Sequence, residues 1–241
     1  MATYRELHGK AVKTVTTNPT DDAAEGQIWF NSTDNKFKSV VGITATRSGS
    51  FMSTTRANGG SIGSTRDASA VAGGYTSTAN TNVTEEFNGS GFSTGGNLNT
   101  SRRALTGTGV ITAGLVCAGY AATESNATEE YDGSAFSNGG NLNTARFHTG
   151  TFGTQTAGVA AGGSAPSPAK NITEEYNGSA WTTVPATLSV GRQEHMAGGT
   201  ETAGICCGGQ PPYTTATEEY DGSAWTTGGS LNTARAGIQG S

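Results

Sequence analysis

The chain has 241 residues, of which 37 are glycine and only 33% are hydrophobic, and its formal net charge is −5. Its 14 Lys and Arg residues form no cluster, whereas binding to nucleic acid needs several basic groups on one face, so we expect no nucleic-acid partner. No apolar run approaches the roughly 18 residues that suggest a transmembrane helix, so we expect no membrane partner either. This composition predicts a thin, repetitive β structure rather than a thick apolar core.

Residues 1–24 are interpreted as an N-terminal arm or docking segment, within which residues 10–17 are a candidate strand. The next segment, 25–44, contains the string EGQIWFNSTDNKFKSVVG at 25–42. Two short runs of β-forming residues flank a polar turn in this string, which predicts a hairpin.

The remaining residues, 45–241, are built from repeats. A Thr-Glu-Glu-aromatic phrase begins at Thr84, Thr128, Thr173 and Thr217, with a period of about 45 residues, in the range of repeat folds. A run that ends in Gly-Gly and a phrase that ends in Arg recur in the same register. The predicted units span about 51–97, 98–141, 142–187 and 188–230, followed by a half unit at 231–241.

Each unit predicts four short strands. A segment of small residues follows the Arg, then come the apolar run, the Glu-Glu-aromatic run and an aromatic run that leads to the next Arg. Four strands in a repeat of this length are typical of a β-propeller blade. The small-residue segment fits the innermost strand, because blades crowd together near the axis of a propeller.

The two glutamates of each phrase do not form a catalytic pair in this interpretation. A two-residue turn at 221–222 would pair Glu218 with Trp225, since an Asp-Gly step favours a tight hairpin. Alternation along the strand then places Glu218, Tyr220 and Trp225 on one face and Glu219 on the other. The two carboxylates therefore point in opposite directions.

The matching periods predict contacts between blades. We expect one glutamate of each phrase to face a neighbouring blade and to pair with the repeated arginines. These residues are Glu85, Glu129, Glu174 and Glu218, with Arg56, Arg102, Arg146, Arg192 and Arg235. The aromatic residues expected to pack between blades are Tyr131, Tyr176, Tyr220, Trp181 and Trp225. The sequence assigns no role to the second glutamates, Glu86, Glu130, Glu175 and Glu219.

The order of these phrases resembles the kelch motif, most clearly at 162–163, Tyr176 and Trp181. The second unit departs from the motif, because Ala118 stands in place of a glycine. Phenylalanine replaces the tryptophan in two units, at Phe92 and Phe136. The resemblance covers residues from about 51 to 235 and implies an all-β, kelch-like propeller of four-stranded blades.

The segment 25–42, followed by repeats of the ATEEYDGSAWTTGGSLNTAR type, also resembles virion structural proteins of tailed phages, particularly marine ones. The alternative is that the GQxWxNxT string is merely a generic hairpin. The resemblance implies a virion location, as a tail, neck or capsid appendage, with several copies of the chain or a homo-oligomer in each particle.

The preferred architecture has five blades. The end of the chain, 236–241, would supply an innermost strand, and segments 10–17, 27–32 and 36–41 would complete the fifth blade. The alternative is that residues 1–24 anchor the chain in another virion protein and that the repeats form an incomplete ring or one that another subunit completes.

No catalytic, metal-binding or cofactor-binding residue is predicted, and we expect no enzyme. The three histidines, His8, His148 and His195, do not match the ligand set of a copper oxidase related to the kelch fold. No nucleophile elbow occurs. The three cysteines lie in short apolar runs and are expected to be buried as small hydrophobic residues: Cys117, Cys206 and Cys207.

The links between the second and third strands differ among the units, and variable loops on a fixed scaffold are typical of a recognition surface. The candidate recognition residues are Tyr75, Tyr120, Pro166, Pro168, Pro211, Pro212 and Tyr213. Neutral drift of unconstrained loops explains the variation equally well. The sequence therefore favours a non-enzymatic structural or adhesive virion protein that binds a host-surface polysaccharide or protein receptor. The alternative is a decoration or cement module that binds other virion proteins, and a carbohydrate-active enzyme is a remote alternative.

Overall fold

The computed structural model describes residues 13–15, 28–33, 35–39, 51–165 and 168–237. The chain divides into two compact units, residues 1–49 and residues 50–241. All the regular elements in the described residues are strands. The all-β class predicted from the sequence is therefore confirmed.

The first unit contains a three-stranded sheet, formed by β1 (Lys13–Val15), β2 (Ile28–Asn31) and β3 (Lys36–Ser39). Strands β2 and β3 form an antiparallel hairpin within segment 25–44, whereas β1 pairs with β2 in parallel. The other residues of the 1–24 arm lie outside the described residues. A propeller blade is an antiparallel meander, so this sheet does not have the strand pairing that the sequence interpretation gave to a fifth blade.

The second unit contains four four-stranded antiparallel sheets, which we call blades 1 to 4. Blade 1 consists of β4 (Gly60–Thr65), β5 (Ala68–Ala72), β6 (Thr84–Phe87) and β7 (Phe92–Thr94). Blade 2 consists of β8 (Thr106–Val110), β9 (Ala113–Cys117), β10 (Thr128–Tyr131) and β11 (Phe136–Asn138). Blade 3 consists of β12 (Gly150–Thr154), β13 (Ala157–Ala161), β14 (Thr173–Tyr176) and β15 (Trp181–Val184). Blade 4 consists of β16 (Met196–Thr200), β17 (Ala203–Cys207), β18 (Thr217–Tyr220) and β19 (Trp225–Thr227).

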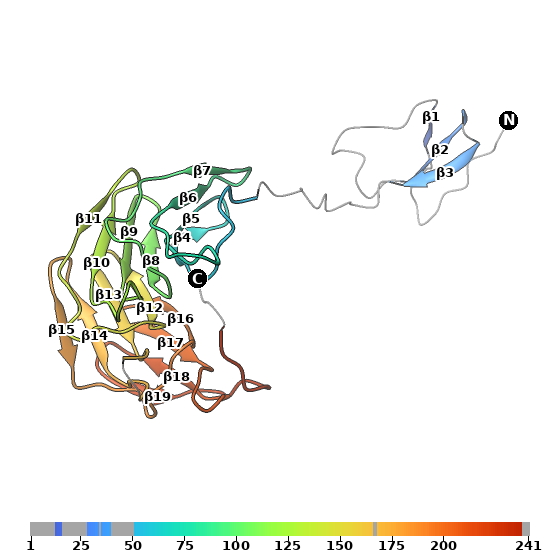
Figure 1. Cartoon of the computed structure of the whole chain (residues 1–241). Coiled ribbons are helices and arrows are strands. Elements are labelled where there is room, and N and C mark those ends of the chain that lie inside the picture. The colour runs from blue at the N-terminus through green and yellow to red at the C-terminus, as the bar shows by residue number, and fades with distance from the viewer. Residues whose placement is uncertain (1–12, 16–27, 34, 40–50, 166–167, 238–241) are drawn as a thin grey trace. The chain divides into compact units, whose positions relative to one another are not determined.

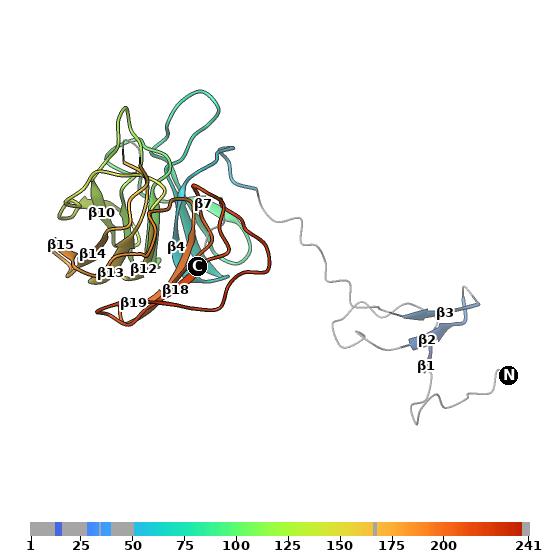
Figure 2. The ribbon, with the colours of Figure 1, turned by 90° about the horizontal axis from the view of Figure 1, so that it is seen from below.

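The blades are arranged as in a propeller. Their first strands pack side by side in the order β4, β8, β12 and β16 around the centre, and their last strands lie at the rim (Figure 1). Figure 2 shows the rim strands β15 and β19 from below. The structure thus shows four blades where five were predicted. No comparable packing joins β16 back to β4 within residues 51–165 and 168–237.

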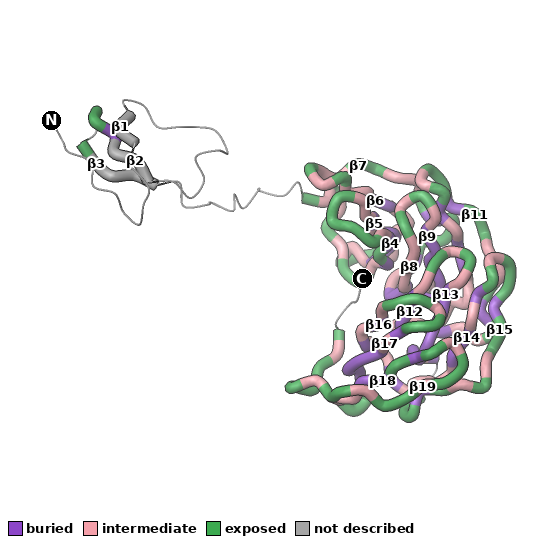
Figure 3. Tube along the Cα trace, turned by 180° about the vertical axis from the view of Figure 1, so that it is seen from behind, coloured by how far each residue is buried: buried purple, intermediate pink, exposed green. Residues whose placement is uncertain are grey.

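Neighbouring blades pack closely because a glycine in the second strand of one blade receives an apolar side chain from the blade before it. A Cβ atom added to Gly114 would lie only 2.5 Å from Cγ2 of Ile62, and one added to Gly204 would lie 2.2 Å from Cε2 of Phe152. Three apolar clusters result, one at each contact between successive blades. Figure 3 shows the buried segments running through the sheets, while many of the turns are exposed.

The turn between the last two strands of each blade differs from the prediction. The predicted two-residue turn at 221–222 would have placed Ser223 opposite Tyr220. In the structure Tyr220 pairs with Trp225, so the turn comprises residues 221–224. The Asp221 carboxylate accepts hydrogen bonds from the amides of Ser223 at 2.7 Å and Ala224 at 2.7 Å. This Asx turn stabilises a loop that is two residues longer than the predicted turn. Because the register moves by two, the predicted faces of the strands are unchanged.

Candidate functional site

The repeated arginines and the first glutamates form buried ion pairs within each blade. The pairs are Arg56 with Glu85, Arg102 with Glu129, Arg146 with Glu174, and Arg192 with Glu218. The exposed fraction of each of these side chains is 4% or less. Each pair ties the third strand of a blade to the segment that enters that blade. The partners are those predicted, but the pairs lie within a blade and not between neighbouring blades, because each arginine directly precedes the blade that holds its glutamate.

The carboxylates of these pairs also hold the segment that connects successive blades. Glu174 accepts hydrogen bonds from the backbone amides of Asn143 at 2.7 Å and Thr144 at 3.4 Å, besides pairing with Arg146. A buried carboxylate needs such partners, because taking an unpaired charge out of water is costly. The pair therefore has a structural role, and its arginine is not available to a ligand.

Arg235 behaves differently from the other repeated arginines. Its side chain is exposed, and its Nε atom donates only to the backbone carbonyl of Thr233, at 3.3 Å. No carboxylate pairs with it among the described residues.

The structure gives a role to three of the second glutamates, Glu86, Glu130 and Glu175, which the sequence interpretation left unassigned; Glu219 is exposed. The Tyr176 hydroxyl of blade 3 donates to Glu130 of blade 2 at 2.6 Å, and the Tyr220 hydroxyl of blade 4 donates to Glu175 of blade 3 at 2.6 Å. Tyr131 donates to Glu86 in the same way. Burial, reinforced by the bond to Glu130, raises the pKa of Tyr176 to about 12, so the hydroxyl stays protonated and donates.

The tryptophans form a second bond between blades. The indole Nε1 of Trp181 donates to Oγ1 of Thr128 in the preceding blade at 2.9 Å, and Trp225 donates to Thr173 at 2.9 Å. Within a blade, the rings of Tyr176 and Trp181 are tilted against each other with centroids 5.0 Å apart. The predicted aromatic set thus lies between blades rather than in a ligand site.

At one end of the propeller, which we call the axial end, equivalent backbone positions carry different side chains around a cavity. Five equivalent backbone positions, each two residues after a repeated arginine, have φ between 52° and 71°. They are Asn58, Ala104, His148, Glu194 and Gly237. The backbone amide of each of the last four donates a hydrogen bond to the carbonyl of the equivalent residue in the preceding repeat, at 2.7 to 3.2 Å. All five line one cavity of about 240 Å³.

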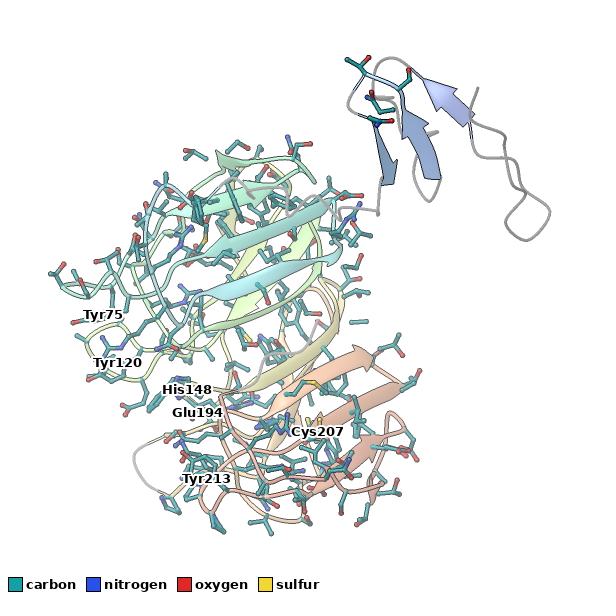
Figure 4. The ribbon with its side chains drawn as sticks, turned by 90° about the vertical axis from the view of Figure 1, so that its right-hand side faces the viewer. Tyr75, Tyr120, His148, Glu194, Cys207 and Tyr213 are labelled. Atoms are coloured by element: carbon teal, nitrogen blue, oxygen red, sulfur yellow. The ribbon has the colours of Figure 1, made fainter. Side chains whose placement is uncertain are left out.

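A second set of equivalent residues directly precedes these positions in the chain. Isolated bridges join Ala57 to Tyr75, Arg103 to Tyr120, Phe147 to Ser164, and Gln193 to Gln210. The Arg103 guanidinium lies 4.8 Å from the ring centroid of Tyr75 and 4.8 Å from that of Tyr120, so it joins blades 1 and 2. Figure 4 shows Tyr75, Tyr120, His148 and Glu194 along the same side of the molecule.

The candidate recognition residues fall into two groups. The structure brings Tyr75 and Tyr120 together through Arg103, and both are half-buried. Tyr213 is 64% exposed on its loop, where Pro211 and Pro212 are also exposed. Pro168 is exposed as well, and Pro166 lies outside the described residues. Sequence reasoning did not find Arg103, although it follows the repeated arginine of its unit directly.

The two described histidines lie near the axis, but in different surroundings. His148 Nδ1 lies 3.2 Å from Glu194 Oε1 at the cavity, and burial lowers the pKa of His148 despite this carboxylate. His195 is 4% exposed and packs against Gly150 and Gly162 of blade 3, and burial lowers its pKa to about 3. In the part of the chain that the structure describes, no group of three His, Cys, Asp or Glu side chains could hold a metal ion. The cysteines there are free and buried, and burial raises the pKa of Cys117 to about 12.

Comparison with known families and with curated proteins gives no match for this chain. The described residues contain no helix that is long and apolar enough to cross a bilayer. The inferences below therefore depend on the geometry and on the resemblances seen in the sequence.

Proposed function

We propose that the protein is a non-enzymatic, adhesive component of a phage virion whose axial end binds a host-surface polysaccharide. One observation carries this proposal: the residues that hold the blades together recur from unit to unit, whereas those at the axial end change. The five axial positions share one backbone conformation but carry five different residue types: Asn58, Ala104, His148, Glu194 and Gly237. A constant framework with a variable surface is the arrangement that recognition proteins use.

The chemistry of the axial end suits a carbohydrate. Tyr75 and Tyr120 offer apolar ring surfaces with polar edges, and Arg103 lies between them. The cavity beside them is lined by small polar residues such as Asn58 and Thr149, together with His148 and Glu194. At about 240 Å³ it is smaller than the roughly 300–1,000 Å³ of drug-sized ligand pockets. One sugar of a longer polymer therefore fits the cavity better than a large free ligand.

The virion location rests on the sequence resemblance of segment 25–42 and of the repeats. In that setting the chain would be present in several copies, so weak individual sites would combine into tight attachment. A protein receptor on the host surface is the alternative ligand. A decoration module inside the particle is favoured by a different observation: among the described residues, no following blade packs on blade 4.

The test measures binding of the purified full chain to immobilised bacterial surface polysaccharides and to whole host cells. Arg103→Ala removes the group between the two tyrosines and is expected to weaken binding about tenfold or more. Arg66→Ala is the matched control, because Arg66 is 89% exposed in the turn after β4, at the far end of the inner strand, and pairs only with Asp67. We expect this control to bind like the unmodified chain.

Exchange of loop 210–216 for loop 120–127 should change which polysaccharide is bound. Loss of cell binding after protease treatment of the cells would point to a protein receptor instead. Equal binding by the Arg103→Ala and Arg66→Ala variants would contradict the axial end as the binding surface.

A further inference from the structure

Each of the first three blades presents a set of acceptor groups to the blade that follows it. We call this side of the sheet the forward face. On it, Glu130 accepts the Tyr176 hydroxyl, and Thr128 accepts the Trp181 indole N–H. An apolar side chain of the same face, such as Leu115, packs against a glycine of the following blade, Gly158. The forward face is thus a socket for a tyrosine, a tryptophan and a glycine.

The forward face of blade 4 carries the same set, but no following blade packs on it among the described residues. Glu219 occupies the position of Glu130 but is exposed. Thr217 occupies the position of Thr128, and its Oγ1 atom is buried without a hydrogen-bond partner in the described part of the chain. Ile205 replaces Leu115. A hollow of about 700 Å³ lies over this face, lined by Ile205 and Glu219 with Met196 of the inner strand.

The segment that leaves blade 4 is also prepared for a following blade. It ends in the sequence LNTAR, as the segments that enter blades 2 and 3 end in LNTSR and LNTAR. In those segments the arginine is buried against a glutamate of the blade it enters, whereas Arg235 is exposed. Gly237 nevertheless takes the axial position, and its amide donates to the Glu194 carbonyl at 2.9 Å. Gly237 therefore has the same backbone conformation and hydrogen bond as the residues that precede blades 2 to 4 at this position.

A second copy of this chain does not fit the socket. Among the blades in residues 51–165 and 168–237, blade 1 is the one on whose opposite face no preceding blade packs, and it departs from the pattern on that face. Phe87 stands where blades 2 to 4 have a tyrosine, so it has no hydroxyl to donate to Glu219. Ser69 stands where the other blades have the receiving glycine, which would crowd Ile205.

We propose that the forward face of blade 4 binds a β-blade of the same repeat type supplied by another polypeptide. Its tyrosine hydroxyl bonds to Glu219, its tryptophan indole bonds to Thr217, and its first glutamate pairs with Arg235. The partner is recognised by a Thr-Glu-Glu-Tyr strand followed by a tryptophan strand. This inference does not rest on the proposed carbohydrate binding.

The first test compares two alanine variants of the full chain in isolation. Glu175→Ala removes the acceptor of the Tyr220 hydroxyl at a covered face, so we expect a lower thermal unfolding midpoint. Glu219→Ala removes the equivalent group from the free face, so we expect the midpoint to stay unchanged. An equal fall in both variants would overturn the proposal, because the face would already be covered by residues 1–49 or by a second copy. Sedimentation analysis would tell these two apart.

The second test supplies the missing blade as a probe. A copy of residues 195–234 is added directly after Gly237, in place of 238–241. We expect this extension to raise the unfolding midpoint, to resist proteolysis, and to make the chain sensitive to Glu219→Ala. The matched control carries the same extension with phenylalanine at the position copied from Tyr220, and it should gain less. An extension that leaves the midpoint unchanged and is digested like an unfolded tail would overturn the proposal.

Discussion

The contact between blades 1 and 2 and the contact between blades 3 and 4 use the same backbone arrangement with different side chains. In the first, Leu105 packs on Gly60 and Gly73, whereas in the last, His195 packs on the equivalent Gly150 and Gly162. An apolar residue and a titratable residue thus occupy one kind of pocket. The difference shows that the position demands a certain volume, while its chemistry is free to vary.

The two contacts also differ in their hydrogen bonds. Trp225 donates to Thr173 between blades 3 and 4. Between blades 1 and 2, Phe136 has no N–H to donate, and Oγ1 of Thr84 is buried without a partner. The last contact therefore gains a bond that the first lacks, but it also carries the buried histidine. Substitutions that exchange the indole hydrogen bond or the buried histidine between the two contacts separate their effects on the unfolding free energy.

The largest effect is expected from the buried ion pair that recurs within every blade. Arg192→Met leaves the buried Glu218 carboxylate without its charged partner, which should cost about 3–5 kcal/mol of unfolding free energy. Denaturant unfolding of the purified chain measures this value. Arg235→Met is the matched control, since Arg235 is exposed, and it should change the unfolding free energy by less than about 0.5 kcal/mol. Similar losses in both variants would show that Arg192 is not held in a buried pair.

A smaller, pH-dependent effect is expected from His195. Burial lowers its pKa to about 3, below the value of about 6.5 in the unfolded chain. As the pH falls below about 6.5, the unfolded state takes up a proton that the folded state does not, so the folded state loses stability. The loss is at most about 1.4 kcal/mol per pH unit and continues down to a pH of about 3.

His195→Leu copies the residue of blade 2 and should remove this part of the pH dependence. Unfolding free energies at pH 7 and pH 5 for the variant and the unmodified chain measure the difference. His148→Asn is the comparison variant, because His148 is only partly buried beside Glu194. If the stability of His195→Leu falls as steeply between pH 7 and pH 5 as that of the unmodified chain, His195 is not the group responsible.

Much of the blade could be predicted from the sequence because the repeat samples each position several times. The pairing of arginine with the first glutamate followed from their shared period, and the innermost strand followed from its small residues. The turn at 221–224 was predicted two residues too short, because an Asp-Gly step does not reveal whether the Asp side chain caps the loop. The role of Glu130 depends on a tyrosine 46 residues away in another blade. One signal existed: the first unit, before which the described residues contain no blade, has Phe87 in place of tyrosine.

The fifth blade and the axial end were harder to predict. Short β-forming runs at 10–17, 27–32 and 36–41 indicate strands, but they do not indicate direction, and β1 pairs with β2 in parallel. The contact of Arg103 with Tyr75 and Tyr120 depends on an arginine that occurs in one unit, so no period reveals it, although the tyrosine occurs at the same position of the first two units. A residue that occurs in one unit has no counterpart in the other units, so the repeat gives no indication of its contacts.

The smallest effect is expected from repairing the contact between blades 1 and 2. Phe136→Trp introduces an indole N–H at the position from which Trp181 and Trp225 donate, and it would satisfy Oγ1 of Thr84. A hydrogen bond of this kind should add about 0.5–1.5 kcal/mol to the unfolding free energy. Trp181→Phe is the reverse change at the next contact and should remove a similar amount. A loss of stability in Phe136→Trp would show instead that this contact is packed for phenylalanine, and that the unpaired threonine is the cost of that packing.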